Sequence, residues 1–229
     1  MPAPMSPVSG AVRLVAGKAA FAALLFATAG TVAWPAAWAY LATITAVMIV
    51  YGVILVRVQP ELIEERRNPP ADAKKWDKPF VVIVGMVGPV ALLLLAGLDH
   101  RFRWSAPTPP WPQAAGLFAV AAGGMLTNYA VAANRFFSAI VRIQRDRGHH
   151  VIDAGPYRYI RHPGYAGSIL HMIGVSFALG SRVALAGAIS FCLVLAVRTA
   201  LEDRTLRREL DGYEEYARRV RFRLLPGVW

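Results

Sequence analysis

Residues 155–165 read GPYRYIRHPGY and gather the side chains best suited to chemistry in this chain. Within eleven residues they supply two prolines, three tyrosines, two arginines and a histidine. The segment lies between two long apolar regions, where polar groups are costly unless they have partners to hold. Proline also restricts the direction of the chain near both ends of the segment. We therefore expect residues 155–165 to form one wall of a polar binding site.

A second polar group follows the next apolar region and consists of Arg198, Glu202 and Asp203. Arg198 and Glu202 are four residues apart, so they share one face of a helix. The apolar stretches 164–180 and 183–201 are separated only by a short turn, which predicts a helical hairpin. Because the far ends of a hairpin are neighbours, we expect this group to face the segment rich in tyrosine and arginine.

Each of these residues also has a purely structural interpretation. Arg158 and Arg161 could anchor lipid phosphates, and the tyrosines could belong to an aromatic belt at the membrane surface. Arg198 could extend its charge towards the headgroups or pair with Glu202. A charged residue one turn inside a span nevertheless indicates a functional role. The combination with a segment bounded by prolines favours a binding site.

The rest of the chain has the composition of a membrane protein. Hydrophobic residues make up 56% of the 229 residues and charged residues only 17%, whereas a soluble domain carries about 25% charged residues. Residues 19–56 contain no Asp, Glu, Lys or Arg, and as a helix they would extend about 57 Å, nearly twice the ~30 Å hydrocarbon core of a bilayer. We predict an all-α, polytopic membrane helical bundle of about six spans, with a C-terminal helix hairpin and a cytoplasmic amphipathic helix. The predicted spans are 12–33, 36–57, 79–98, 113–133, 164–180 and 183–201, and the amphipathic helix covers 202–221.

The positions of the basic residues predict the side of the membrane on which each loop lies. With six spans, both termini share a side with loops 57–78 and 134–162. Of the 25 Lys and Arg residues, only Arg101, Arg103 and Arg182 fall on the opposite side. The positive-inside rule therefore places both termini in the cytoplasm. Because the basic residues flank the spans, the net charge of +11 indicates contact with anionic lipid headgroups and not with nucleic acid.

Other polar features are weaker candidates for a site. His149 and His150 are adjacent and point in different directions, and the single cysteine, Cys192, lies in an apolar run, so no metal site is expected. The charged segment 59–78 is either a solvated loop with local ion pairs or a cap over a neighbouring pocket. Span four contains small and polar residues of the kind that permits close helix packing, namely Gly123, Gly124, Thr127 and Asn128.

The segment GPYRYIRHPGY resembles the signature of the isoprenylcysteine carboxyl methyltransferase family and of related membrane phospholipid methyltransferases. The features downstream also follow in a similar order: a helix hairpin, the acidic pair Glu202-Asp203 where the family usually has Glu-Glu, a Gly-Tyr…Tyr pattern and a closing Leu-Pro. The last two features fall on Gly212, Tyr213, Tyr216, Leu225 and Pro226. The resemblance covers about residues 128–229. It indicates one integrated domain with an N-terminal four-span region, 1–133, and a cofactor-binding catalytic region, 134–229.

The resemblance implies an integral membrane enzyme that uses S-adenosylmethionine without a Rossmann domain, and the sequence contains no GxGxxG motif. Arginine suits the carboxylate of this cofactor, a carboxylate such as Glu202 suits its ammonium or ribose hydroxyls, and tyrosine rings suit its adenine or sulfonium. Asp203 is one methylene shorter than the usual second Glu. The implied cofactor site comprises Gly155, Tyr157, Arg158, Tyr159, Arg161, His162, Pro163, Tyr165, Glu202 and Asp203.

The implied reaction transfers a methyl group to a lipophilic or prenylated substrate that enters from the bilayer, with a carboxylate as the expected acceptor. Arg198 would hold such a carboxylate. His162 would be the base for an amine acceptor, as in a phospholipid N-methyltransferase. A transporter or a non-catalytic scaffold is a further alternative, although the spans lack midplane charges and repeat symmetry of the kind found in transporters. In a bacterium, the expected location is the inner membrane.

Overall fold

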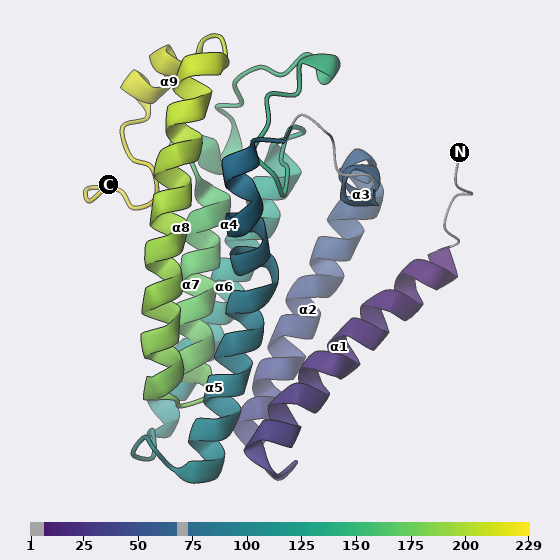
Figure 1. Ribbon diagram of the computed structural model, residues 1–229, viewed down its shortest axis with the longest axis vertical. Coiled ribbons are helices and arrows are strands. Elements are labelled where there is room, and N and C mark those ends of the chain that lie inside the picture. Colours follow the sequence, from purple (N-terminus) through teal and green to yellow (C-terminus); the bar gives the residue numbers. More distant parts are fainter. Residues whose placement is uncertain (1–6, 68–72) are drawn as a thin grey trace.

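Proline marks the start of several long helices, because its fixed backbone angle suits the first turn and its missing N–H is not needed there. The computed structural model describes residues 7–67 and 73–229. The α-helices of this part of the chain (Figure 1) are α1 Pro7–Ala29, α2 Pro35–Arg57, α3 Pro60–Arg67, α4 Lys78–Val82, α5 Gly88–Phe102, α6 Pro110–Ala133, α7 Pro163–Ala178, α8 Arg182–Glu209 and α9 Tyr213–Arg219. Pro35, Pro110 and Pro163 occupy the first positions of α2, α6 and α7.

Four helical stretches in the described part of the chain are long and apolar enough to cross a membrane, namely Pro35–Arg57, Lys75–Phe102, Pro110–Ala133 and Arg182–Glu209. The second of these is continuous from α4 to α5 through a π-helical turn that precedes Pro89. Proline has no backbone N–H and so cannot donate the usual helical hydrogen bond. Together with α1 and α7 the four stretches form an all-α bundle, and residues 7–67 and 73–229 contain no β-strand. The predicted fold class, a polytopic membrane helical bundle, is confirmed.

The predicted hairpin of the last two spans is formed by α7 and α8, which lie side by side (Figure 1). Gly180 makes the turn with a φ of +68°, a conformation that favours glycine. Ser181 then caps α8, because its hydroxyl accepts a hydrogen bond from the N–H of Ala184 at 2.9 Å. The expectation of a separate amphipathic helix over 202–221 was wrong. The last span continues as α8 to Glu209, and Gly212, with a φ of +78°, separates it from the short α9.

Close packing between α6 and α7 holds the start of α7 in place. A Cβ atom added to Gly123 would lie 2.5 Å from the carbonyl oxygen of Gly167, and one added to Gly167 would lie 2.5 Å from the carbonyl oxygen of Gly123. Gly116 and Gly174 meet in the same way one heptad away. Glycines at this spacing let two helix backbones approach directly. The prediction of helix packing at Gly123 is therefore confirmed.

The polar residues of α6 also serve packing. Asn128 donates from Nδ2 to the carbonyl oxygen of Val47 in α2 at 3.0 Å. Thr127 donates to the carbonyl oxygens of Gly123 and Gly164, the latter at the start of α7. A hydroxyl or amide inside a membrane bundle needs such partners, because no water is present to satisfy it. These bonds fix α2 and α7 against α6.

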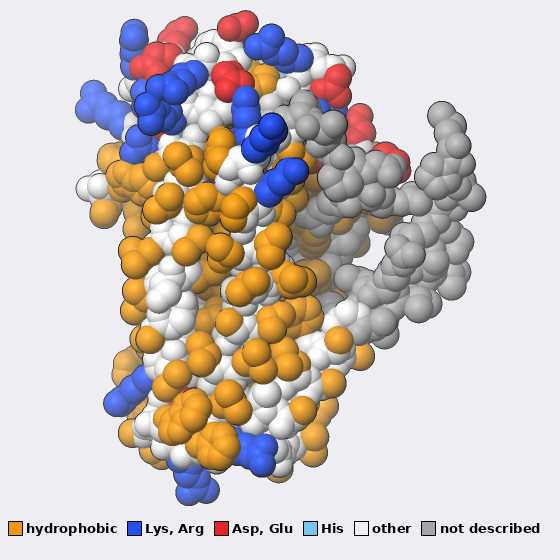
Figure 2. All heavy atoms as spheres, in the orientation of Figure 1, with side chains coloured by type: hydrophobic (Ala, Val, Ile, Leu, Met, Phe, Trp, Pro, Cys, Tyr) orange, Lys and Arg blue, Asp and Glu red, His pale blue; other side chains and the backbone are white. Residues whose placement is uncertain are grey.

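The charged side chains gather at one end of the bundle. Figure 2 shows orange hydrophobic side chains over the middle of the visible face, and most of the blue and red ones around the end of α8 and α9. We call this end, where α8 finishes at Glu209, the charged end. An apolar belt between polar ends is what a bilayer requires of a spanning bundle. The protein is an integral membrane protein.

Candidate functional site

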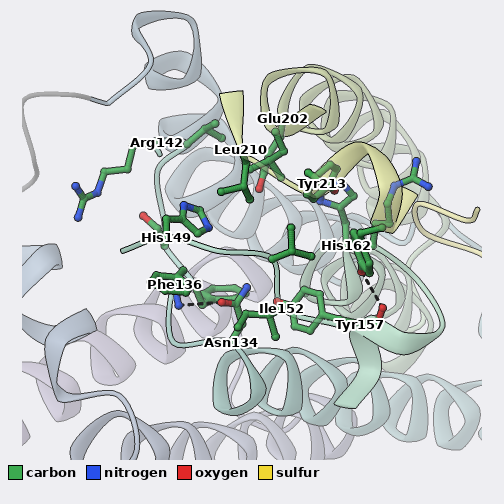
Figure 3. Close-up of a pocket in the computed structure, with 18 of the residues that line it drawn as sticks. Asn134, Phe136, Arg142, His149, Ile152, Tyr157, His162, Glu202, Leu210 and Tyr213 are labelled. Atoms are coloured by element: carbon green, nitrogen blue, oxygen red, sulfur yellow. Dashed lines mark hydrogen bonds between the residues drawn. The ribbon is translucent and has the colours of Figure 1, made fainter. Parts of the chain in front are cut away.

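A cavity opens at the charged end, where four parts of the chain converge. They are residues 134–162, the start of α7, the end of α8, and α9. The cavity holds about 800 Å³ of space free of atoms, including its open mouth. Figure 3 shows side chains from these parts arranged around it. Its polar and aromatic lining residues include Asn134, Phe136, Arg142, His149, Tyr157, Arg161, His162, Tyr165, Glu202, Tyr213 and Tyr216.

The structure brings five of the sequence-predicted residues to this cavity, namely Tyr157, Arg161, His162, Tyr165 and Glu202. Gly155, Pro163, Asp203 and Arg198 lie behind the lining residues and do not line the cavity themselves. Arg158 and Tyr159 are exposed, and Tyr159 shows 70% of its surface to solvent. The exposure of Arg158 and Tyr159 is consistent with the structural interpretation, in which these side chains lie at the membrane surface.

Asp203 is the centre of a buried ionic cluster. Arg161 donates to its two carboxylate oxygens from Nε at 2.7 Å and from Nη2 at 3.1 Å. His162 lies with Nε2 3.3 Å from Oδ1. Three more side chains donate to the same carboxylate, namely Arg207, Tyr213 and Arg223. The oxygens of Asp203 are therefore occupied by the protein's own donors.

The same cluster ties the C-terminal segment to the start of α7. Arg161 also donates from Nη1 to the carbonyl oxygens of Val220 and Arg221 at 2.6 and 2.9 Å. Its backbone N–H donates to Phe222, and that of His162 donates to Arg223. The segment GPYRYIRHPGY thus lies against the C-terminal tail, and Arg161 joins the start of α7 to α8 and to this tail.

Glu202 presents a carboxylate at the cavity wall. Tyr165, in the first turn of α7, donates a hydrogen bond from its hydroxyl to Oε2 of Glu202 at 2.5 Å. The other oxygen, Oε1, has no hydrogen-bond partner among the described residues. The ring of His162 stacks on that of Tyr165, with centroids 5.8 Å apart and planes 8° from parallel. The wall therefore offers one unpaired anionic oxygen beside two flat rings.

Arg198 lies one turn deeper in α8 than Glu202 and pairs with a residue far away in the chain. It donates from Nε and Nη2 to the two oxygens of Asp77 at 2.8 and 3.0 Å. Nη2 also donates to the carbonyl oxygen of Ala139. The guanidinium lies over the ring of Tyr165, 5.3 Å from its centroid. The alternative that Arg198 pairs with Glu202 is not what the structure shows.

The loop 134–154 supplies most of the lining residues that sequence reasoning missed. His149 accepts a hydrogen bond at Nδ1 from the backbone N–H of Gln144, and Gln144 donates from Nε2 to the carbonyl oxygen of Phe136. Burial, helped by the nearby charges of His150, Arg142 and Arg147, lowers the pKa of His149 to about 4. The imidazole is therefore neutral at physiological pH. The alternation of apolar and basic residues after Phe136 was the only sequence signal for this wall.

The charged segment 59–78, whose role the sequence left open, lies against this loop. Gln59 donates to the carbonyl oxygen of Val131, and the N–H of Lys74 donates to that of Val141. Ser138 in the loop donates to Glu65 of α3. The described part of this segment therefore supports the cavity wall from outside.

Comparison with known proteins gives matches that centre on the same region. Residues 115–208 match the sequence model of the isoprenylcysteine carboxyl methyltransferase (ICMT) family. A probable protein-S-isoprenylcysteine O-methyltransferase of Oryza sativa subsp. indica is 34% identical over 111 residues, which cover 46% of this chain and 56% of that protein. The protein-S-isoprenylcysteine O-methyltransferase B of Arabidopsis thaliana is 30% identical over 116 residues, 48% of this chain and 57% of that one. The matched part thus spans little more than half the length of these relatives.

A solved structure shares the fold over most of the chain. The eukaryotic intramembrane Ras methyltransferase ICMT aligns with a TM-score of 0.57 and 19% identity, covering 92% of this chain and 75% of that one. This likeness extends the shared architecture beyond the segment that matches in sequence. Residues 115–208, which carry the segment GPYRYIRHPGY, Arg198 and the acidic pair, are therefore similar in sequence to the isoprenylcysteine carboxyl methyltransferase family.

Proposed function

We propose that this protein is a membrane methyltransferase that uses S-adenosylmethionine to methylate a carboxylate on a lipophilic substrate. The observation that carries the proposal is the free oxygen of Glu202 in a cavity walled by the region that matches the family. Matching relatives from Oryza sativa and Arabidopsis thaliana are named for O-methylation of isoprenylcysteine, which supports the choice of a carboxylate acceptor.

The residues around the cavity fit the chemical groups of S-adenosylmethionine. The unpaired oxygen of Glu202 suits an ammonium or a ribose hydroxyl. The rings of Tyr157, Tyr165 and Tyr213 suit a flat adenine or a sulfonium cation. Arg161 lines the cavity beside them, and Asp203 holds its guanidinium in a fixed orientation. We therefore assign cofactor contact to Tyr157, Arg161, His162, Tyr165 and Glu202.

The other residues that the family resemblance implies for the cofactor site do not contact the cofactor in this proposal. Gly155 has a φ of +57°, and a Cβ there would lie 3.0 Å from the Cβ of Ala133, so this position shapes the segment. Pro163 begins α7 and so sets the direction in which Tyr165 projects. Asp203 fixes Arg161. Arg158 and Tyr159, which are exposed, contact the lipid surface.

When bound, the cofactor supplies a methyl group on a sulfonium centre, and the protein needs no nucleophile of its own. The contribution of the chain is to orient the reactants and to exclude water, which is worth roughly 7–11 kcal/mol in well-oriented cases. Arg198 is our candidate for holding the acceptor carboxylate, because its Nη1 donors have no partner among the described residues. It lies deeper in the bundle than Glu202, on the side from which a lipophilic acceptor would come.

We place the charged end in the cytoplasm, where the soluble cofactor is available, as the distribution of Lys and Arg indicates. In a bacterium the membrane would be the inner one. Reporter fusions to the C-terminus test this orientation, and a C-terminus outside the cytoplasm would contradict it.

Calorimetry on the purified protein in detergent tests the proposal directly. Wild-type protein binds S-adenosylmethionine, and Glu202→Gln, which keeps the shape and removes the charge, weakens binding at least tenfold. Glu209→Gln is the matched control, because Glu209 ends the same helix and pairs with Lys74 outside the cavity. Equal affinity in wild type and Glu202→Gln would contradict the assignment. A wild-type protein that binds no cofactor would favour a non-catalytic scaffold.

A phospholipid N-methyltransferase is the second candidate, and the geometry of His162 favours it. Its ring lines the cavity with Nε2 against the Asp203 carboxylate, so its other nitrogen could accept a proton from an amine. Lipid extracts from cells with and without the gene distinguish the two candidates. A change in methylated headgroups supports N-methylation, whereas unchanged headgroups together with methyl esters on prenylated thiols support the carboxylate acceptor.

A further inference from the structure

Asp77 is a buried carboxylate that connects Val141, which lines the cavity, with Arg198, which does not. It ends the 3₁₀ turn Lys75–Asp77 just before α4, and only 1% of its surface is exposed. Its two oxygens accept hydrogen bonds from Arg198, and Oδ2 accepts a third from the N–H of Val141 at 2.8 Å. Asp77 thus joins the start of one span to the end of another, 121 residues away. It lies outside residues 115–208, the part of the chain that matches the family.

A second carboxylate, Glu202, lies on the same helix as the Arg198 guanidinium. Glu202 lies four residues after Arg198 in α8, where side chains share a helix face and pair readily. A buried guanidinium is costly without a carboxylate partner, which favours pairing of Arg198 with one of the two. In the structure it binds Asp77, and among the described residues only the hydroxyl of Tyr165 donates a hydrogen bond to Glu202.

We propose that Asp77 is a positioning residue that draws Arg198 away from Glu202 and so keeps the free oxygen of Glu202 available to the cofactor. The inference rests on the proposed function. The connection runs from Asp77 to Arg198, from Arg198 onto the ring of Tyr165, and from the Tyr165 hydroxyl to Glu202. Without Asp77, Arg198 turns to Glu202 and neutralises the charge that the cavity offers.

The test compares S-adenosylmethionine binding by calorimetry in wild type, Asp77→Asn, and the double variant Asp77→Asn with Arg198→Gln. We expect Asp77→Asn to bind the cofactor about tenfold more weakly, although Asp77 does not line the cavity. The double variant removes the freed guanidinium, so its affinity returns to within about threefold of wild type. Replacing both members of a buried pair is also often tolerated by the fold, and thermal melting confirms that each variant is folded.

Asp99→Asn is the matched control. Asp99 is also buried, with 3% of its surface exposed, and lies at the opposite end of the span that begins beside Asp77. Its partners are Ser105 and Ser181, far from the cavity. We expect this variant to melt earlier and to bind the cofactor as wild type does.

Each outcome decides between the proposals. If wild type binds the cofactor and Asp77→Asn binds equally well, Asp77 does not position the site. If the double variant binds as weakly as Asp77→Asn, loss of binding comes from general destabilisation and the competition with Glu202 is refuted. Wild-type protein that binds no S-adenosylmethionine refutes the proposed function, and this inference with it.

Discussion

Replacing Gly167 by alanine should separate the two helices that carry the candidate site. The new Cβ would lie 2.5 Å from both the carbonyl oxygen of Gly123 and the Oγ1 of Thr127, and 2.9 Å from the N–H nitrogen of Thr127. Two of these atoms belong to the α6 backbone and cannot turn aside. To bring the new Cβ to van der Waals distance from these atoms, α7 has to move away from α6 by about 1 Å. A misplacement of that size can reduce a reaction rate about 100-fold.

The consequence for activity follows from the place of Gly167 in α7. It lies two residues after Tyr165 and five after His162, so a shift of the helix moves both rings at the cavity. Overpacking of this kind also costs about 1–3 kcal/mol of stability. We expect Gly167→Ala to fold with a lower melting temperature and to transfer methyl groups about 100-fold more slowly.

The assay is methyl transfer from labelled S-adenosylmethionine to N-acetyl-S-farnesylcysteine, with thermal melting of the same samples. Gly174→Ala is the matched control, because its Cβ would lie 2.7 Å from the backbone nitrogen of Val120 in the same interface. Gly174 is seven residues further along α7, about 10 Å deeper in the bundle. The Gly174→Ala variant should lower the melting temperature about as much as Gly167→Ala does, with a much smaller loss of activity. Full activity and unchanged melting of Gly167→Ala would refute the close approach of α6 and α7 at this point.

Two further predictions concern stability. Asp203→Asn leaves Arg161 without its buried carboxylate and should lower the free energy of unfolding by about 3–5 kcal/mol. A melting temperature in detergent within a degree of wild type would argue against a stabilising ionic cluster around Asp203. The pKa of His149 is lowered from 6.5 to about 4 in the folded protein, so the unfolded chain takes up a proton first as the pH falls. The contribution of His149 to stability is complete above about pH 6.5 and is lost progressively towards pH 4. Melting at pH 7 and pH 5 measures this loss, which His149→Gln should reduce; an equal loss in that variant would assign the effect to other groups.

Much of the bundle could be predicted because its signals are local. The uncharged stretch 19–56 and the prolines at helix starts depend only on neighbouring residues, and α1, α2 and α6 lie where these signals indicated. The continuation of α8 to Glu209 was missed because the polar residues after Leu201 suggested a change of environment. They instead continue the same helix beyond its apolar part.

The candidate site divides in the same way. The composition of GPYRYIRHPGY and the hairpin after it were enough to bring Tyr165, His162 and Glu202 to one cavity. The sequence left open whether Arg198 pairs with Glu202, extends its charge towards the headgroups or holds the carboxylate of an acceptor. The loop 134–154 was not recognised as a wall, because an irregular segment has no periodicity that shows which side chains face inward.

The sequence by itself determined that this chain spans a membrane, which residues are polar at the charged end, and which family the region 115–208 resembles. Only the tertiary structure decided how the charges are paired. Arg198 binds Asp77, and Asp203 accepts hydrogen bonds from Arg161 and from Arg223 in the C-terminal tail. The physical reason is that a buried charge takes whichever partner the packing of distant segments brings within about 3 Å, and that choice is not encoded in local spacing.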